Sequence, residues 1–227
     1  MDFQAKLLTH IDEKHLLKHA FYQMWTEGTL PIEVMQKYAE QYYHLERNFP
    51  NFLSAMLMTC DSEVARVAIL DNFNDETAGA KNHRELWLRF GEGIGATRQA
   101  MKNSTPLPET LAAIETFTRL CSKNYLIGAA ALAAYESQIP AIAAKKLEGL
   151  IANYGITDER THEFFAVHGS IDIKHANVWW DMLKDADLSE EEKTEAEAST
   201  KEASEALWNF LTGVLKAHMP EALTMKC

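Results

Sequence analysis

The chain has 227 residues, of which 47% are hydrophobic, and a formal net charge of -11. Its length and apolar content allow a large buried core, most simply in a single domain spanning residues 1–227. The acidic charge and the lack of a basic run in the sequence disfavour nucleic acid and anionic membranes as partners, because both require clustered Lys and Arg.

The first half of the chain predicts three amphipathic helices separated by turn residues. Gly28 stops the first helix, and Pro31 occupies the favoured first position of the second. The glycines of GEGIG are expected to end the third helix. This segment is not predicted to be a nucleotide-binding loop, because it lacks the preceding strand and the spacing of such a loop. The predicted spans are 6–27, 31–58 and a third helix from a cap at Asp61–Ser62 to the glycines at 91–95.

The second half predicts four more helices, after a loop that extends to Pro106 and Pro108. Pro140 starts or kinks one of them, and Ser189 with Glu192 forms a capping box for the last. The predicted helices are 108–137, 140–153, one capped by Thr157, and 189–217, and the tail from about 218 is expected to fray. About seven helices and no convincing strand predict an all-α bundle.

Cysteine usage and hydropathy predict a soluble, cytoplasmic protein. The three cysteines, Cys60, Cys121 and Cys227, are odd in number and lack paired spacing, which suits a reducing compartment better than a disulfide framework. Residues 1–15 lack the apolar core of a signal peptide, and the longest apolar run, 126–135, is too short to cross a bilayer.

The stretch HGSIDIKH carries the strongest chemical signal in the chain. It places His168, Asp172 and His175 at spacings of four and seven residues, which on a helix bring the three side chains within roughly 60° of one another. A random chain of this composition would contain this pattern only about 0.02 times, so a solvated polar stripe is the weaker interpretation. The pattern predicts half of a metal site.

Two further segments supply candidate ligands. Glu76 and His83 are seven residues apart on what the pattern predicts to be one helix, although this spacing occurs about once by chance. Glu136 follows Tyr135 in the apolar run LIGAAALAAYES, where a carboxylate is costly to bury unless a metal ion or a basic side chain neutralises it. Three helices therefore offer three carboxylates and three imidazoles.

This donor set favours particular metals. A helical bundle builds such sites from inward Glu, Asp and His side chains on facing helices. Six ligands without a thiolate suit iron or manganese better than tetrahedral zinc, and three carboxylates offset most of the charge of two divalent ions. A redox-active pair of ions that activates dioxygen is the natural inference.

With these residues in place, the chain resembles the heme-oxygenase-like di-metal oxygenases over nearly its whole length. Within that superfamily it is most similar to the CADD group, named for a chlamydial protein associating with death domains. The resemblance implies a heme-oxygenase-like bundle, two divalent ions (Fe/Fe or Fe/Mn), dioxygen and a reductant as co-substrates, and formation of para-aminobenzoate for folate. It also implies the metal ligands Glu76, His83, Glu136, His168, Asp172 and His175.

The resemblance extends to residues that take part in the reaction. Tyr22 matches the tyrosine thought to be consumed as the aromatic source, and Lys146 matches the lysine thought to donate nitrogen. Tyr135 matches a tyrosine proposed to assist radical transfer. Each polypeptide would then act once. Helices of this fold often pair between subunits, which makes a homodimer an expectation, and the sequence leaves the electron donor open.

Other functions remain open from the sequence. An oxygenase of the same fold could act on an external small molecule, and a non-enzymatic interaction module would need no metal. A heme oxygenase could use His19 as its heme ligand, but the helix expected to be glycine-rich is alanine-rich here. A thiaminase-like enzyme needs a nucleophilic cysteine where this chain has Ala131, and neither Cys60 nor Cys121 fills that role. A cofactor-independent quinone-forming oxidase would not need all six ligands.

Without the resemblance, several of these residues have simpler interpretations. Tyr22 would be a core aromatic, and Lys146 a solvated charge beside Lys145. Packing is the expected role for Tyr42, Tyr43 and His44. The sequence assigns no role to Glu46, His162 and Asp181, which are plausible neighbours of the ligands.

Overall fold

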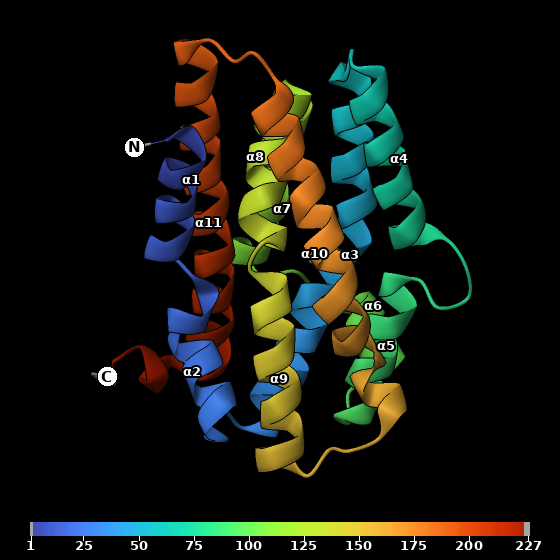
Figure 1. Ribbon diagram of the computed structural model, residues 1–227. Coiled ribbons are helices and arrows are strands. Elements are labelled where there is room, and N and C mark those ends of the chain that lie inside the picture. Colours follow the sequence, from blue (N-terminus) through green and yellow to red (C-terminus); the bar gives the residue numbers. More distant parts are fainter. Residues whose placement is uncertain (1, 225–227) are drawn as a thin grey trace.

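The computed structural model describes residues 2–224, apart from the side chains of residues 170–174. The described residues form eleven α-helices and two short 3-10 helices, with no strand among them, which confirms the predicted all-α class (Figure 1). The elements are α1 (Phe3–Glu13), η1 (Leu16–Lys18), α2 (Ala20–Glu27), α3 (Ile32–Thr59), α4 (Glu63–Thr77), α5 (His83–Gly93), α6 (Arg98–Asn103), α7 (Pro108–Lys123), α8 (Tyr125–Glu136), α9 (Ile139–Tyr154), α10 (Glu159–Asp185), α11 (Glu190–His218) and η2 (Pro220–Leu223).

Two differences account for the larger number of α-helices: α6 lies in the segment that was predicted to be a loop, and three of the predicted long helices are broken. In each case a short polar side chain caps the helix that follows the break. His19 accepts a hydrogen bond from the Phe21 amide at the start of α2, and Asn124 accepts one from the Leu126 amide at the start of α8. Such side chains offer the backbone an alternative to continuing the helix. Helical periodicity alone does not detect these breaks.

The predictions for the remaining helices are closer. Helix α3 runs without interruption through Pro50, and Pro140 lies in the first turn of α9. The Ser189–Glu192 capping box is formed at the start of α11. In the tail, where the sequence predicts fraying, Pro220–Leu223 forms a 3-10 helix whose Ala222 is buried. Cys227 lies outside the described residues.

Helix α8 is the centre of the bundle. Every residue from Leu126 to Glu136 is buried, and α7, α10 and α11 all pack against this helix. Its alanines allow the surrounding helices to approach closely. By length and composition alone the stretch Tyr125–Tyr154 could cross a membrane, but 78% of its most apolar window is buried by the bundle, as in the core helix of a soluble protein.

The remaining helices surround this core (Figure 1). Helix α1 lies along α11, and α2 packs on α9. Helix α3 packs on α7, α4 and α5, while α10 packs on α9, α8 and α5. The loop between α4 and α5 extends outward at the edge of the molecule. Helices α3, α4, α5, α8 and α10 enclose the candidate ligands.

Candidate metal centre

Five helices bring six buried carboxylate and imidazole side chains together. They are Glu46 on α3, Glu76 on α4, His83 on α5, Glu136 on α8, and His168 and His175 on α10. Ligand atoms of Glu46, Glu76 and His83 lie within 4.8 Å of one another, as do those of Glu76, Glu136 and His175. Glu76 belongs to both groups, so its carboxylate lies between two candidate metal positions.

Five of the six ligands predicted from the sequence lie in this region. His168 and His175 share α10, as their spacing predicts, and the His168 and His83 ring centroids are 4.2 Å apart. The backbone of Asp172 belongs to the same helix, but its side chain lies outside the described residues. Its predicted role as a ligand stays a prediction.

The prediction that Glu76 and His83 share one helix is wrong. Helix α4 ends at Thr77, and the chain turns through Gly79, which has a φ of 76°. This left-handed conformation is readily adopted by glycine. Asn82 then caps α5, whose first residue is His83. The two side chains nevertheless meet, with 2.7 Å between His83 Nδ1 and Glu76 Oε2.

Hydrogen bonds orient the imidazoles of α10. His168 Nδ1 donates to the Phe164 carbonyl at 2.6 Å, which leaves Nε2 as the ligand nitrogen. His175 Nε2 lies 3.2 Å from an Asp75 carboxylate oxygen, while its Nδ1 lies 3.8 Å from Glu136 Oε1. The Trp179 indole donates to the other Glu136 oxygen. Such outer hydrogen bonds fix the tautomer and orientation of metal ligands.

The cluster concentrates negative charge that requires neutralisation. Burial, together with the Glu76 charge, raises the pKa of Glu46 and of Glu136 to about 8. Burial alone would lower the pKa of His83, but the Glu76 carboxylate outweighs it and raises this pKa to about 9. Without a cation, the buried carboxylates therefore hold protons that they would lack in water. The donor set fits divalent metal ions, which would replace those protons.

A second buried group lies beside the cluster and includes Tyr22 and Lys146. Lys146 Nζ donates to the Tyr38 hydroxyl at 2.7 Å, and the Tyr38 and Tyr22 hydroxyls are 3.0 Å apart. The same Nζ lies 4.9 Å from the centroid of the Tyr22 ring. Burial lowers the pKa of Lys146 to about 7, so a large fraction of this amine is neutral at neutral pH. Lys146 is not the solvated charge of the simpler interpretation.

Three residues without a catalytic assignment from the sequence, Tyr38, Tyr42 and Glu46, lie between these groups. The Tyr135 hydroxyl donates to the Tyr42 hydroxyl at 2.7 Å, and Tyr42 interacts with the Glu46 carboxylate. The rings of Tyr42 and Tyr38 lie 5.5 Å apart. The available signal was the i, i+4, i+8 spacing of Tyr38, Tyr42 and Glu46, which places all three on one stripe of α3.

The other residues singled out in the sequence lie outside the cluster. His162 interacts through its ring with the Ile156 carbonyl, and Asp181 lines a separate surface hollow. His19 caps α2 through Nδ1 and interacts with Thr212 through Nε2, so both ring nitrogens are occupied and a heme ligand role is not supported. Burial raises the pKa of the thiols of Cys60 and Cys121, which makes them poor nucleophiles.

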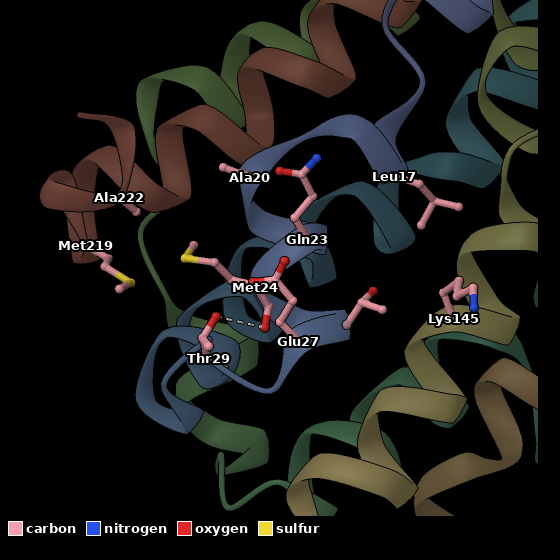
Figure 2. A pocket seen from close by; sticks show the side chains of 10 residues that line it. Leu17, Ala20, Gln23, Met24, Glu27, Thr29, Lys145, Met219 and Ala222 are labelled. Atoms are coloured by element: carbon pink, nitrogen blue, oxygen red, sulfur yellow. Dashed lines mark hydrogen bonds between the residues drawn. The ribbon is translucent and has the colours of Figure 1, made fainter. Parts of the chain in front are cut away.

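The described residues leave little space beside the cluster. A void of about 20 Å³ is lined by Glu46, Glu76, His83, Glu136 and His168, together with Tyr42, Phe49, Tyr135 and Ile139. This volume suffices for about one water molecule. A hollow of about 920 Å³ lies elsewhere, over the outer face of α2 between Lys145 and Met219 (Figure 2), and its lining includes no residue of the cluster.

Comparisons with known proteins show which family the chain belongs to. The family model of iron-containing redox enzymes matches residues 36–209. The chain is 37% identical over 222 residues to the 4-aminobenzoate synthase of Nitrosomonas europaea, covering 93% of this chain and 90% of that protein. It is 35% identical over 217 residues to the 4-aminobenzoate synthase of Chlamydia muridarum, covering 95% and 91%.

A solved structure supports the fold. A domain with a heme oxygenase-like fold from Shewanella denitrificans superposes with a TM-score of 0.81 at 19% identity, covering 95% of this chain and 91% of that chain. These findings confirm the predicted resemblance and the predicted fold. The chain therefore belongs to the iron-containing redox enzyme family, which it shares with the 4-aminobenzoate synthases of Nitrosomonas and Chlamydia.

Proposed function

We propose that this protein is a cytoplasmic 4-aminobenzoate synthase that consumes its own Tyr22 side chain and takes nitrogen from Lys146. The observation that carries the proposal is the buried Lys146 amine, 4.9 Å from the centroid of the Tyr22 ring. The relatives named 4-aminobenzoate synthase support the identity of the product.

The chemistry of the product explains why these two side chains suffice. 4-Aminobenzoate is a benzene ring that carries a carboxyl group and a para amine. A tyrosine side chain supplies the ring and, as its Cβ, the carboxyl carbon. Its conversion requires cleavage between Cα and Cβ, oxidation of Cβ to a carboxylate, and replacement of the phenol oxygen by nitrogen. The pKa of about 7 keeps much of the Lys146 amine neutral, as a nitrogen donor must be.

The buried cluster is the proposed site of two metal ions, iron with iron or iron with manganese. Glu76, His83, Glu136, His168, Asp172 and His175 would hold them, and the pair would supply oxidising power from dioxygen and a reductant. Phe164 and Asp75 orient the imidazoles of His168 and His175. Tyr135 and Tyr42 form a hydrogen-bonded pair beside the cluster, and the Tyr42 ring contacts the ring of Tyr38, whose hydroxyl accepts from Lys146.

The close packing favours an internal substrate over an external one. A void of about 20 Å³ cannot hold an aromatic molecule, which needs several times that volume. The chain itself places aromatic rings next to the Lys146 amine, since the ring centroids of Tyr22 and Tyr38 lie 4.9 and 4.8 Å from Nζ. An oxygenase acting on an external molecule would require these side chains to move apart.

Intact mass and peptide mapping test the proposal. Protein loaded with iron and manganese would be exposed to dioxygen and a reductant and then mapped. We expect loss of the Tyr22 side chain, modification at Lys146 and at most one 4-aminobenzoate per chain. Tyr22→Phe and Lys146→Arg should abolish product formation. Tyr154→Phe, which alters a tyrosine bonded to the Leu30 carbonyl, serves as the matched control. An unchanged mass despite dioxygen consumption would indicate an external substrate.

A further inference from the structure

Glu46 occupies the position of an additional ligand in the buried cluster. It is 6% exposed, and its carboxylate meets Glu76 and His83 with ligand atoms within 4.8 Å of one another. These three side chains come from three different helices, α3, α4 and α5. Convergence of three buried ligand side chains from separate elements is typical of a metal position in a helical bundle.

The surroundings of Glu46 differ from those of other buried carboxylates on the same helix. Glu40, two turns earlier on α3, forms an ion pair with Lys37 at 2.9 Å. Within the described part of the chain, no Lys or Arg forms an ion pair with Glu46. Lys146 and His83 interact with its charge without forming an ion pair, so this buried carboxylate still requires a cation or a proton. The Tyr42 hydroxyl, which accepts a hydrogen bond from Tyr135, interacts with this carboxylate and lowers its pKa, as do the groups that orient metal ligands.

From these contacts we propose that Glu46 is a seventh protein ligand of the centre, bound to the same ion as His83 and Glu76. The inference rests on the proposed di-metal function. Glu46 and His83 form one group with Glu76, and Glu136 and His175 form the other, so each ion would receive at least two ligands besides the shared carboxylate. With Glu46, four carboxylates match the charge of two divalent ions, where the six predicted ligands provide three.

Manganese binding tests the assignment without relying on turnover. Metal-free wild type and the Glu46→Gln variant would be titrated with Mn²⁺ by calorimetry, with free and bound Mn²⁺ followed by EPR. The amide keeps the size of the side chain and an oxygen acceptor for Tyr42 but removes the charged ligand. We expect the affinity of one of the two ions to fall about tenfold or more. The EPR signal of the coupled ion pair should be lost at Mn²⁺ concentrations that fill the wild type.

Control variants separate the possible causes of this result. Glu40→Gln removes a mostly buried carboxylate from the same helix and should leave both affinities unchanged. Circular dichroism of the metal-free variants would establish that each is folded, and Glu46→Asp, which keeps the charge, should bind more tightly than Glu46→Gln. Two wild-type affinities and an unchanged EPR signal in Glu46→Gln would overturn the assignment. Fewer than two ions in the wild type would instead contradict the proposed di-metal function.

Discussion

At the scale of single residues, Lys146 is held in a cage of aromatic rings. Its amine lies between 4.8 and 5.6 Å from the centroids of Tyr22, Trp25, Tyr38, Tyr42, Trp87 and Phe165. Contact with the faces of aromatic rings favours the ammonium form. Burial opposes that form and dominates, because it lowers the pKa from 10.5 to about 7. The folded protein therefore binds the proton of Lys146 less tightly than the unfolded chain does.

This difference predicts a pH-dependent cost of burying Lys146. Between pH 7 and 10.5 the unfolded chain binds the proton and the folded protein does not, so the stability of the wild type should rise with pH relative to Lys146→Met. From pH 6 to pH 9 we expect a relative gain of roughly 2–3 kcal/mol. Urea unfolding of the metal-free proteins at both pH values measures it.

Lys145 provides the matched control for this measurement. It is adjacent in sequence but exposed, and it pairs with Glu148 at the surface. Lys145→Met should show no comparable dependence on pH. If the difference in free energy of unfolding between wild type and Lys146→Met were the same at pH 6 and pH 9, the amine would not be titrating in a buried environment.

At the scale of helices, the break between α4 and α5 places His83 at the first position of a helix. Asn82 accepts a hydrogen bond from the Glu85 amide at 3.1 Å and thereby fixes the start of α5. A capping side chain of this kind contributes about 1 kcal/mol to stability. The cap should also hold the backbone from which His83 reaches Glu76.

Asn82→Ala should therefore affect both stability and metal binding. We expect a loss of about 1 kcal/mol in the free energy of unfolding and roughly tenfold weaker binding of Mn²⁺. Ser189→Ala removes the cap of α11, so it should cost a similar stability with no change in Mn²⁺ affinity. Equal effects of the two substitutions on Mn²⁺ affinity would show that the Asn82 cap has no particular role in the centre.

The helices also show what the sequence could predict. Hydrophobic periodicity and helix-end signals predicted α3, α9 and α11. The starts of these helices are marked by residues that act locally, namely Pro31, Pro140 and the capping box of Ser189 with Glu192. The break at 78–82 coincides with Gly79 and the cap Asn82, but neither residue type by itself ends a helix. At Asn124 apolar residues continue on both sides of the break, and tertiary packing decides whether the helix does so too.

The sequence likewise predicted part of the candidate site and missed part of it. The residues of HGSIDIKH share α10 because i, i+4 and i+7 positions are a property of any helix. Glu76 and His83 meet through tertiary structure and not through helical spacing. The sequence made Glu46 only a plausible neighbour of the ligands, because no other carboxylate or imidazole lies three, four or seven residues from it on its own helix. Only the packing of α3 against α4 and α5 turns that carboxylate inward.

At the scale of the whole molecule, folding and metal binding should be coupled through the charge of the centre. In the metal-free protein, burial and the Glu76 charge raise the pKa of Glu46 and Glu136 to about 8, against 4.5 as the ordinary value. The folded state then binds these protons more tightly than the unfolded chain. The stability that they contribute is complete below about pH 4.5 and is lost as the pH rises through 8.

The contribution of these two carboxylates to the free energy of unfolding should consequently fall by at least about 2 kcal/mol between pH 5 and pH 8 in the metal-free protein. Saturating Mn²⁺ should reduce or reverse this fall, because the ion takes the place of the protons and binds only the folded protein. Urea unfolding at several pH values, with EDTA or with Mn²⁺, measures both curves. A double variant, Glu46→Gln with Glu136→Gln, removes these two titrating groups and serves as the reference, because Lys146 and the buried histidines contribute a pH dependence of the opposite sign to both proteins. If the metal-free wild type lost no stability relative to the double variant between pH 5 and pH 8, the two carboxylates would not be held protonated, and protons could not be what the metal ions replace.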